Sequence, residues 1–199
     1  MNFNIKEAVS DFKKGKFLIV IDDKNREDEG DLVLAASKAT PEKVNFMIKQ
    51  AGGLICVPME GKRLDELEIP LMTKNNTEYT KCAFTIPVDC KKGTTTGISA
   101  FDRARTIQKL ADKKSKANDF AKPGHIFPLR AEEKGLKKRK GHTEASIELC
   151  KLARAYPAAV ICEIIGKNGR MARSNELRQF AKKHKIRIIA ISDLIGQID

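Results

Sequence analysis

The sequence contains no tryptophan, and aromatic residues make up only 6% of its 199 residues. A chain with so few rings offers no obvious stacking platform for the bases of single-stranded nucleic acid. Cysteine occurs five times and never as Cys-x-x-Cys. The odd number and the spacing argue against a disulfide framework or a structural zinc site, so we expect most of the cysteines to be small core residues.

Long apolar runs are also missing. None reaches the roughly 18 residues that a transmembrane helix needs, and residues 1–16 lack the apolar block of a signal peptide. We therefore expect a cytoplasmic, globular protein without a membrane partner. Hydrophobic residues make up 41% of the chain, which is long enough for one domain with a sizeable core.

Acidic side chains are in the minority. The 38 lysines and arginines outnumber the 26 aspartates and glutamates, which gives a formal net charge of +12. Such an excess can attract nucleic acid, or it can steer a small phosphorylated substrate toward the protein. The basic residues are scattered along the sequence, so much of the excess is explained by ordinary solvated surface.

Many of the acidic residues gather directly after an apolar run. Residues 17–21 predict a strand buried on both faces, and six carboxylates follow within ten residues. Packed this closely they repel one another unless Arg26 or a metal ion intervenes, although an isolated acidic turn is usually just solvated. A calcium-binding loop is excluded because Asp28 and Leu34 stand where that loop needs glycine and glutamate. Any metal here needs further ligands from elsewhere in the chain. The six carboxylates are Asp22, Asp23, Glu27, Asp28, Glu29 and Asp31.

Strand and helix patterns alternate along the rest of the chain. We predict a single α/β (α+β) domain over residues 1–199, with a mixed sheet and helices packed on its faces. Residues 112–122 predict a loop, and two prolines argue against a central strand over 123–131. Pro58 should close the strand before it. The expected strands are 17–21, 31–36, 54–57, 83–88, 159–165 and 186–191, and the expected helices are 3–14, 41–51, 64–67, 100–111, 142–156 and 174–184.

Three further positions carry candidate chemistry. His125 and His142 each follow a glycine in a predicted loop, where an imidazole is available to titrate or to bind a metal. The start of the 142–156 helix, with the basic residues before it, predicts a phosphate cradle, although a helix cap beside a solvated, mobile loop explains the same residues. Glu163 lies in an otherwise apolar strand and needs either a salt bridge or a raised pKa. The cradle comprises Arg139, Lys140, Gly141 and Thr143, of which Thr143 can cap the helix.

Six segments together resemble the 3,4-dihydroxy-2-butanone 4-phosphate synthase family of riboflavin biosynthesis. They follow the order of the family's motifs and span nearly the whole chain. We expect one synthase domain, without the cyclohydrolase domain that is fused to it in bifunctional relatives. The segments are Asn25–Leu32 (NREDEGDL), Gly52–Val57 (GGLICV), Thr95–Arg103 (TTGISAFDR), Pro123–Ala131 (PGHIFPLRA), Arg139–Ala145 (RKGHTEA) and Cys162–Ile164 (CEI).

The resemblance implies a homodimeric lyase that converts D-ribulose 5-phosphate to L-3,4-dihydroxy-2-butanone 4-phosphate and formate. It implies that Mg²⁺ or Mn²⁺ stabilises enediolate intermediates, with Glu27 and His142 as the metal ligands. His125 and Glu163 are implied to be essential for the chemistry, and Asp31 is a further candidate for proton transfer. The implied substrate contacts are Arg26, Glu27, Asp31, Arg139, Lys140, Gly141, His142, Thr143 and Glu163.

Two other functions remain as alternatives. A basic nucleic-acid-binding module would explain the net charge but not the acidic loop, which repels phosphates, so we do not expect a nucleic-acid partner. A different metal-dependent sugar-phosphate isomerase would use a similar set of residues. The release of formate distinguishes the synthase from such an isomerase.

Overall fold

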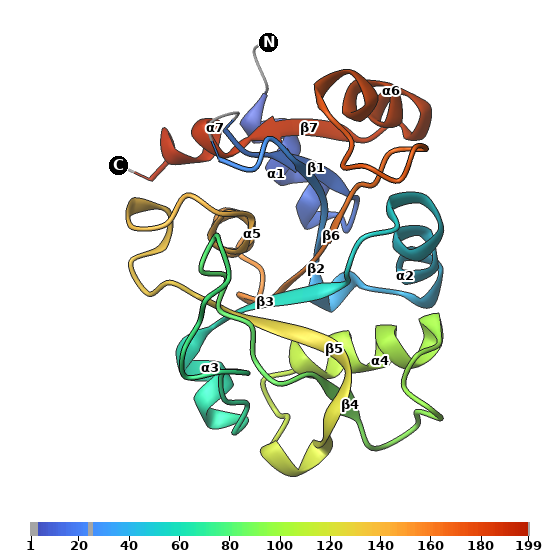
Figure 1. Cartoon of the computed structure of the whole chain (residues 1–199), viewed down its shortest axis with the longest axis vertical. Helices are drawn as coiled ribbons and strands as arrows, with labels where there is room; N and C mark the ends of the chain where they lie inside the picture. The colour runs from blue at the N-terminus through green and yellow to red at the C-terminus, as the bar shows by residue number, and fades with distance from the viewer. Residues whose placement is uncertain (1–3, 24–25, 199) are drawn as a thin grey trace.

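A computed structural model describes residues 4–23 and 26–198, so Phe3 of the first predicted helix and Asn25 of the acidic segment lie outside the described residues. The described residues form a seven-stranded mixed sheet in the order β4-β5-β3-β6-β2-β1-β7, with helices on both faces (Figure 1). This confirms the predicted fold class. The strands are β1 (Leu18–Ile21), β2 (Gly30–Ala35), β3 (Cys56–Glu60), β4 (Val88–Cys90), β5 (Phe120–Ala131), β6 (Ala159–Glu163) and β7 (Arg187–Ala190). The α-helices are α1 (Ile5–Lys13), α2 (Pro41–Phe46), α3 (Gly61–Glu66), α4 (Ala100–Leu110), α5 (His142–Leu152), α6 (Ser174–His184) and α7 (Ile191–Ile195).

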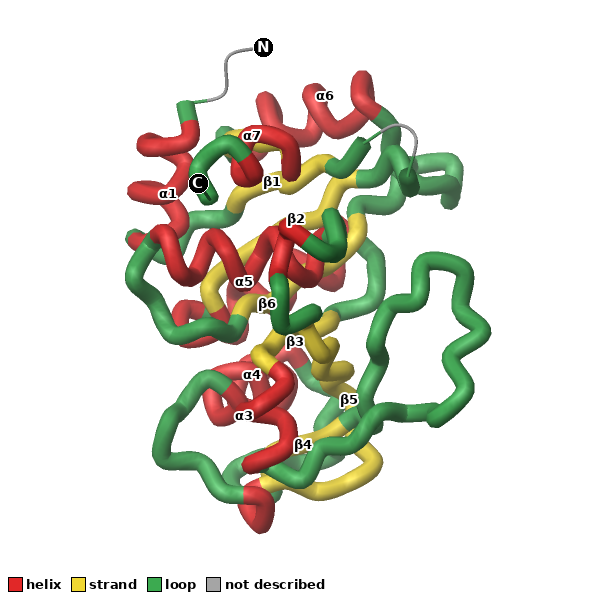
Figure 2. Tube along the Cα trace, turned by 90° about the vertical axis from the view of Figure 1, so that its left-hand side faces the viewer, coloured by secondary structure: helices red, strands yellow, loops and turns green. Residues whose placement is uncertain are grey.

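The side chains of β1 divide between two hydrophobic cores. Leu18 and Val20 pack with α1, α5 and α7 on one face of the sheet, whereas Ile19 packs with α2, α4 and α6 on the other. Figure 2 views the molecule from the side of α1, α5 and α7. Successive side chains of a strand point to opposite faces, so a strand covered on both sides is apolar throughout. Within the described ranges, none of the helices is long and apolar enough to cross a bilayer.

The directions of the central strands bring three chain segments to one edge of the sheet. β2 runs antiparallel to both β1 and β6. The carboxyl ends of β1 and β6 therefore lie beside the start of β2. The acidic segment that joins β1 to β2 also lies at this edge, which positions the candidate site.

Thr40 and Ser99 cap the helices α2 and α4 at their N-termini. Each side chain accepts a hydrogen bond from the backbone N–H three residues later, at 3.4 Å for Thr40 and 3.0 Å for Ser99. The predicted 41–51 helix continues past α2 as a π-helical turn, η2 (Met47–Ala51). It ends at Gly52, whose φ of 81° lies in the left-handed region that glycine adopts most readily.

The expectation that two prolines keep residues 123–131 out of the sheet interior was wrong, because β5 lies between β4 and β3. Proline lacks only the N–H donor, and its carbonyl still accepts. The carbonyl of Pro128 accepts hydrogen bonds from the N–H and the hydroxyl of Thr85, at 3.1 and 2.8 Å. The sheet therefore continues past this proline through its acceptor.

Two neighbouring boundaries also differ from the prediction. Residues 84 and 85 form only isolated bridges, and the regular strand β4 begins at Val88. Pro58 lies inside β3 rather than after it, paired with Leu129 of the parallel strand β5. Because a parallel ladder does not bond every N–H to one neighbour, a proline can occupy such a position.

Candidate active site and metal centre

Two carboxylates face each other on neighbouring strands at this edge. Asp31 on β2 is the cross-strand partner of Glu163 on β6, and on its other side it pairs with Val20 of β1. Like charges in directly opposed positions destabilise a sheet. A pair that opposes stability in this way is typical of a functional site.

Glu163 is fixed by the backbone of the neighbouring segment. The N–H of Leu54 donates a hydrogen bond to Oε2 of Glu163 at 2.8 Å. A Cβ atom on Gly53 would lie 2.5 Å from this same carboxylate oxygen and 2.5 Å from the Glu163 carbonyl oxygen. Position 53 therefore requires glycine because the two backbones approach so closely.

Asp31 is almost fully buried, with 3% of its surface exposed. Its Oδ1 atom makes no hydrogen bond to any of the residues that the structure describes. Burial raises the pKa of Asp31 from 3.8 to about 7, while His142 opposes the shift and Glu163 adds to it. A carboxyl group with a pKa near neutrality can both release and accept a proton, which suits the predicted role in proton transfer.

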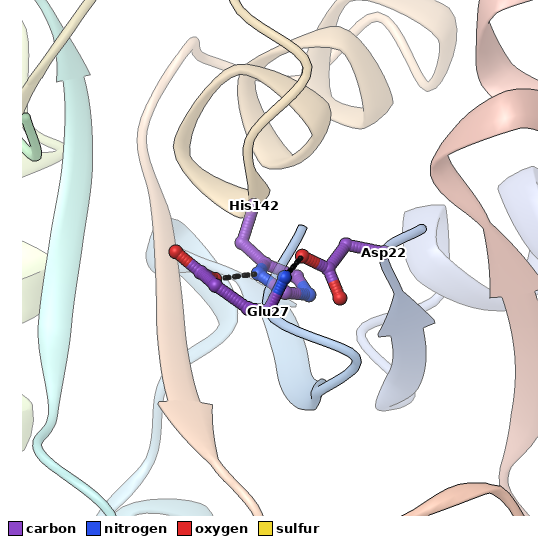
Figure 3. Close-up of side chains that lie close together, drawn as sticks. All are labelled: Asp22, Glu27 and His142. Carbon is purple, nitrogen blue, oxygen red and sulfur yellow. Dashed lines mark hydrogen bonds and ion pairs between the residues drawn. The ribbon is translucent and has the colours of Figure 1, made fainter. Parts of the chain in front are cut away.

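The structure brings the two predicted metal ligands together. Nδ1 of His142 lies 3.6 Å from Oε2 of Glu27. Asp22 completes a group of three side chains whose candidate ligand atoms all lie within 4.8 Å of one another (Figure 3). Two carboxylates and one imidazole are a suitable donor set for Mg²⁺ and, because of the imidazole nitrogen, also for Mn²⁺.

The orientation of His142 fits a ligand role. Its Nε2 atom lies 3.2 Å from the carbonyl oxygen of Val20. A carbonyl oxygen can only accept, so Nε2 carries the proton and the lone pair of a neutral imidazole is on Nδ1, the atom that faces Glu27. Metal-ligating histidines usually have their second nitrogen fixed in this way.

The same carboxylates keep His142 protonated when no other cation balances them. Burial by itself lowers the pKa of His142, but the negative charges of Asp31, Glu27 and Asp22 outweigh it and raise the pKa from 6.5 to about 9. The neighbouring His142 in turn lowers the pKa of Glu27. The cluster therefore attracts positive charge, whether a proton or a metal ion.

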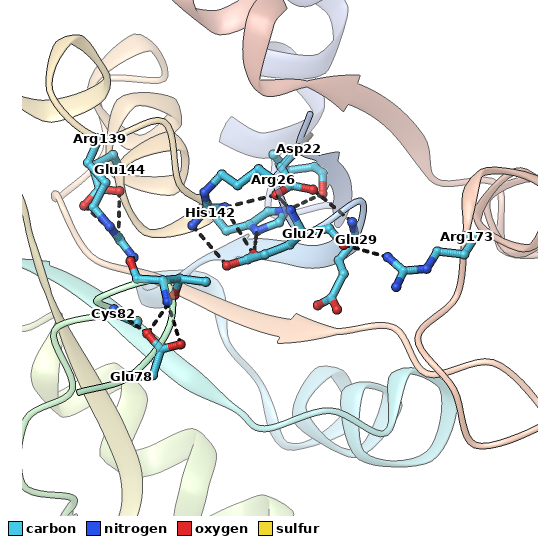
Figure 4. A network of polar contacts seen from close by, with 12 residues as sticks. Asp22, Arg26, Glu27, Glu29, Glu78, Cys82, Arg139, His142, Glu144 and Arg173 are labelled. Atoms are coloured by element: carbon cyan, nitrogen blue, oxygen red, sulfur yellow. Dashed lines mark hydrogen bonds and ion pairs between the residues drawn. The ribbon is translucent and has the colours of Figure 1, made fainter. Parts of the chain in front are cut away.

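Asp22 organises the acidic segment from within. Its two carboxylate oxygens accept hydrogen bonds from the N–H groups of Glu27 and Glu29, at 3.1 and 2.9 Å. The guanidinium of Arg26 bonds to Asp22 at 3.0 Å and to both carboxylate oxygens of Glu27, at 3.0 and 3.1 Å (Figure 4). The predicted ligands and substrate contacts do not include Asp22, one of the six carboxylates, although its place directly after the buried strand is a signal for it.

An anion-binding geometry is present at the start of α5. Gly141 occupies the N-cap position, and a Cβ atom there would lie 2.9 Å from Oε2 of Glu144, 3.1 Å from Nη1 of Arg139 and 3.2 Å from Nη2 of Arg26. Two guanidinium groups and the N–H groups of a helix N-terminus therefore lie around one glycine, together with the Glu144 carboxylate, and the donors among them suit a phosphate. Lys140 beside them is exposed to solvent.

Two details of this segment differ from the prediction. Thr143 is a buried residue inside α5 and does not cap it. Arg139 does not extend freely into solvent: its Nη1 donates to both carboxylate oxygens of Glu144, at 2.9 and 3.2 Å (Figure 4). The side chain of Glu144 is fully buried and also accepts a bond from the N–H of Glu132 at 3.1 Å. Arg139 therefore has a structural partner as well as a place beside the anion site.

His125 lies apart from the metal cluster. It is on β5, which β3 separates from β6, so the backbones of the two strands lie about 10 Å apart at roughly 4.8 Å per strand. Its Nδ1–H donates to Asp89 Oδ2 at 2.7 Å, and its backbone N–H donates to Asp89 Oδ1 at 2.9 Å. The imidazole is 43% exposed. A carboxylate that orients an accessible imidazole suits general acid–base catalysis. The pairing with Asp89 joins residues that are distant in sequence, and the sequence alone gave no sign of it.

Comparisons with known proteins bear directly on this site. The model of the 3,4-dihydroxy-2-butanone 4-phosphate synthase family matches residues 6–197. The chain belongs to this family. It is 48% identical over 194 residues to the 3,4-dihydroxy-2-butanone 4-phosphate synthase of Agrobacterium fabrum, with 98% of this chain and 91% of that synthase covered.

Other members of the family contain additional sequence. The chain is 56% identical over 193 residues to the riboflavin biosynthesis protein RibBA of Endomicrobium trichonymphae, with 97% of this chain but 48% of that relative covered. It therefore spans about half the length of that relative. A crystal structure of 3,4-dihydroxy-2-butanone 4-phosphate synthase in complex with two magnesium ions superposes with a TM-score of 0.93 at 40% identity, and the match covers 98% of this chain and 95% of that synthase.

Proposed function

We propose that this chain converts D-ribulose 5-phosphate to L-3,4-dihydroxy-2-butanone 4-phosphate and formate. The observation that supports this most strongly is the meeting of Glu27, His142, Asp31 and Glu163 at one edge of the sheet. Membership of the synthase family indicates which reaction to expect, and the residues at this edge of the sheet provide the metal ligands and the titratable groups that such a reaction needs. The alternative isomerase uses similar chemistry but releases no one-carbon product.

Glu27 and His142 are the proposed ligands of a divalent cation, Mg²⁺ or Mn²⁺, and Asp22 lies close enough to assist. The fit rests on Nδ1 of His142, which faces Glu27 and can exchange its proton for a metal ion, and on the acidic surroundings. When bound, such a cation acts as a Lewis acid toward substrate oxygens and stabilises negative charge on them.

The substrate phosphate would bind where Arg26 and Arg139 flank Gly141 at the start of α5. Charge-assisted hydrogen bonds from the two guanidinium groups, together with the helix N–H groups, would bind the phosphate and orient the substrate, while the phosphate itself would not react. Lys140 adds positive charge at the rim, and Thr143 contributes an N–H in the first turn. This location sets the sugar across the metal cluster toward Asp31 and Glu163.

Proton transfers are assigned to the titratable groups of the edge. Asp31, with its unpartnered Oδ1 and a pKa of about 7, is placed to take a proton from a sugar carbon and return it. Glu163, fixed by the Leu54 N–H, is a second acid–base group. His125, oriented by Asp89, is the third.

The reaction is tested by incubating the protein with D-ribulose 5-phosphate and Mg²⁺ and measuring formate with formate dehydrogenase. We expect formate release that stops on addition of EDTA and resumes with excess Mg²⁺ or Mn²⁺. Consumption of the substrate with formation of an isomeric pentose phosphate and no formate would instead identify an isomerase.

We also propose that the protein is a homodimer. Large apolar side chains stay exposed near the edge: Leu54 beside Glu163 at 44%, Ile98 at 53% and Phe101 at 71%. Exposed apolar surface next to a site is typical of an interface, and a second copy of the chain would cover it. Light scattering after size exclusion should give twice the chain mass of 22.2 kDa, and a monomer at micromolar concentration would contradict the proposal.

A cytoplasmic location is proposed from the cysteines. All five are free, which fits a reducing compartment. Fractionation of cells that express the protein should recover it with cytoplasmic markers, and recovery from an oxidising compartment would contradict the proposal.

A further inference from the structure

Arg173 reaches from the C-terminal part of the chain to the segment that carries Glu27. It occupies the N-cap position of α6, and its Nη1 donates hydrogen bonds to the backbone carbonyl oxygens of Glu27, at 2.6 Å, and of Asp28. The same nitrogen lies 3.9 Å from the Asp28 carboxylate. Figure 4 shows the guanidinium pointing toward the acidic segment from the side opposite Arg139. Arg173 thus binds the backbone of the segment that carries the Glu27 side chain.

The backbone conformation of this segment needs stabilisation by a side chain from outside it. Asp28 has a φ of 54°, in the left-handed region that non-glycine residues seldom adopt. From the inside, Asp22 binds the N–H groups of Glu27 and Glu29, whereas the carbonyl groups of Glu27 and Asp28 turn the other way, to Arg173. The donors and the acceptors of this turn are therefore satisfied by different side chains.

Arg173 is itself anchored to the sheet. The backbone N–H of Arg173 donates a hydrogen bond to Oε2 of Glu176 in the first turn of α6, at 3.2 Å. The next residue, Leu177, is buried against the start of β2, so closely that a Cβ atom on Gly30 would lie 2.7 Å from its Cδ1. The position of α6 relative to β2 is thereby fixed, and the position of the Arg173 guanidinium with it.

We propose that Arg173 is a positioning residue of the metal site: by binding two backbone carbonyls it holds Glu27 in the conformation that points its carboxylate at His142. The proposal rests on the proposed function, in which Glu27 and His142 hold a divalent cation. Arg173 touches neither the proposed ligand atoms nor the anion site at Gly141. Its removal should therefore weaken metal binding without abolishing turnover once the metal is saturating.

The test measures Mg²⁺ affinity calorimetrically in the absence of substrate. Loss of an outer partner of a metal ligand typically weakens metal binding 10- to 100-fold, so we expect the Mg²⁺ Kd of Arg173→Ala to rise about tenfold or more. Arg173→Lys keeps a cation with several donors and should recover part of the affinity. With saturating Mg²⁺, kcat of Arg173→Ala should stay within about threefold of the parent, since no group that contacts the substrate is removed.

Arg63 provides a matched control. Its Nη2 also donates to backbone carbonyls of a distant segment, those of Asp112 and Ser115, at 3.1 and 2.9 Å, but far from the acidic segment. Arg63→Ala should lower the melting temperature and leave the Mg²⁺ Kd unchanged. An equal rise of the Kd in both variants would show a general loss of stability and would overturn the proposal.

Glu27→Gln distinguishes the positioning role of Arg173 from the metal-ligand role of Glu27. If Glu27→Gln loses Mg²⁺ binding while Arg173→Ala binds Mg²⁺ like the parent, the positioning role is refuted and the metal site stands. If Glu27→Gln binds Mg²⁺ normally, the metal assignment itself fails. Should circular dichroism show that Arg173→Ala is unfolded, Arg173→Met, which keeps the aliphatic stem, takes its place with the same expected rise in Kd.

Discussion

Asp31 should oppose the stability of the protein that contains it. Its pKa rises from 3.8 in an unfolded chain to about 7 in the fold. The difference of about three units corresponds to about 4 kcal/mol of free energy of unfolding lost when the group ionises, at about 1.4 kcal/mol per unit. Because the folded pKa is the higher one, this loss is small near pH 4, grows as the pH rises and is complete above pH 7.

The substitution Asp31→Asn removes the charge and nearly keeps the shape. The buried amide costs about 1–3 kcal/mol if it stays unpaired. We therefore expect Asp31→Asn to be about 1–3 kcal/mol more stable than the parent at pH 8, with most of the advantage gone at pH 5. It should also have lost its activity, since an amide cannot transfer the proton.

The assay is urea unfolding in EDTA at pH 5 and pH 8, followed by circular dichroism, with formate release measured on the same preparations. Asp102 provides the control, because backbone and side-chain hydrogen bonds lower rather than raise its pKa. Asp102→Asn should destabilise the protein at pH 8. If Asp31→Asn also destabilises the protein, and equally at both pH values, then Asp31 is ionised and satisfied in the fold and the reasoning is refuted.

Three further substitutions test other parts of the site. Arg139→Ala should lower the free energy of unfolding by about 3–5 kcal/mol, because it leaves the buried Glu144 carboxylate without its partner; an unchanged urea midpoint would show that the ion pair is dispensable. Gly53→Ala should cut kcat at least tenfold by displacing Glu163, and wild-type turnover would refute the close approach. His125→Ala should lower turnover severely while the melting temperature changes by less than about 2 °C, because the imidazole is partly exposed and outside the hydrophobic core; normal turnover would make it a structural residue.

The sequence predicts much of this fold because its local signals agree with one another. Apolar runs mark the buried strands, and Thr40 and Ser99, which are residue types favoured at helix N-termini, cap α2 and α4. The prediction failed for β5. Proline was expected to be excluded because it lacks an N–H donor, but the carbonyl oxygen of Pro128 still accepts hydrogen bonds from Thr85. The prediction also failed at residues 83–88, whose composition suits a strand while the chain pairs only at isolated positions.

The sequence predicted which residues form the candidate site, but not which partner residues hold them in place. A metal bound to the acidic segment needs further ligands from elsewhere in the chain, the family resemblance implies that His142 is one of them, and Glu27 does lie next to His142. The partners that fix these groups, Asp89 for His125 and Arg173 for the acidic segment, come from distant positions with no local pattern. Such contacts depend on sheet order and register, which a single sequence does not specify.

Diffraction from crystals soaked in Mn²⁺ would show whether Glu27 and His142 share one divalent cation. We expect an anomalous difference peak between a carboxylate oxygen of Glu27 and Nδ1 of His142, bonded to both, and its disappearance in Glu27→Gln crystals soaked identically. If a strong Mn²⁺ peak lies elsewhere in the protein with none between these two side chains, or if the peak is undiminished in Glu27→Gln, the two residues are not the metal ligands.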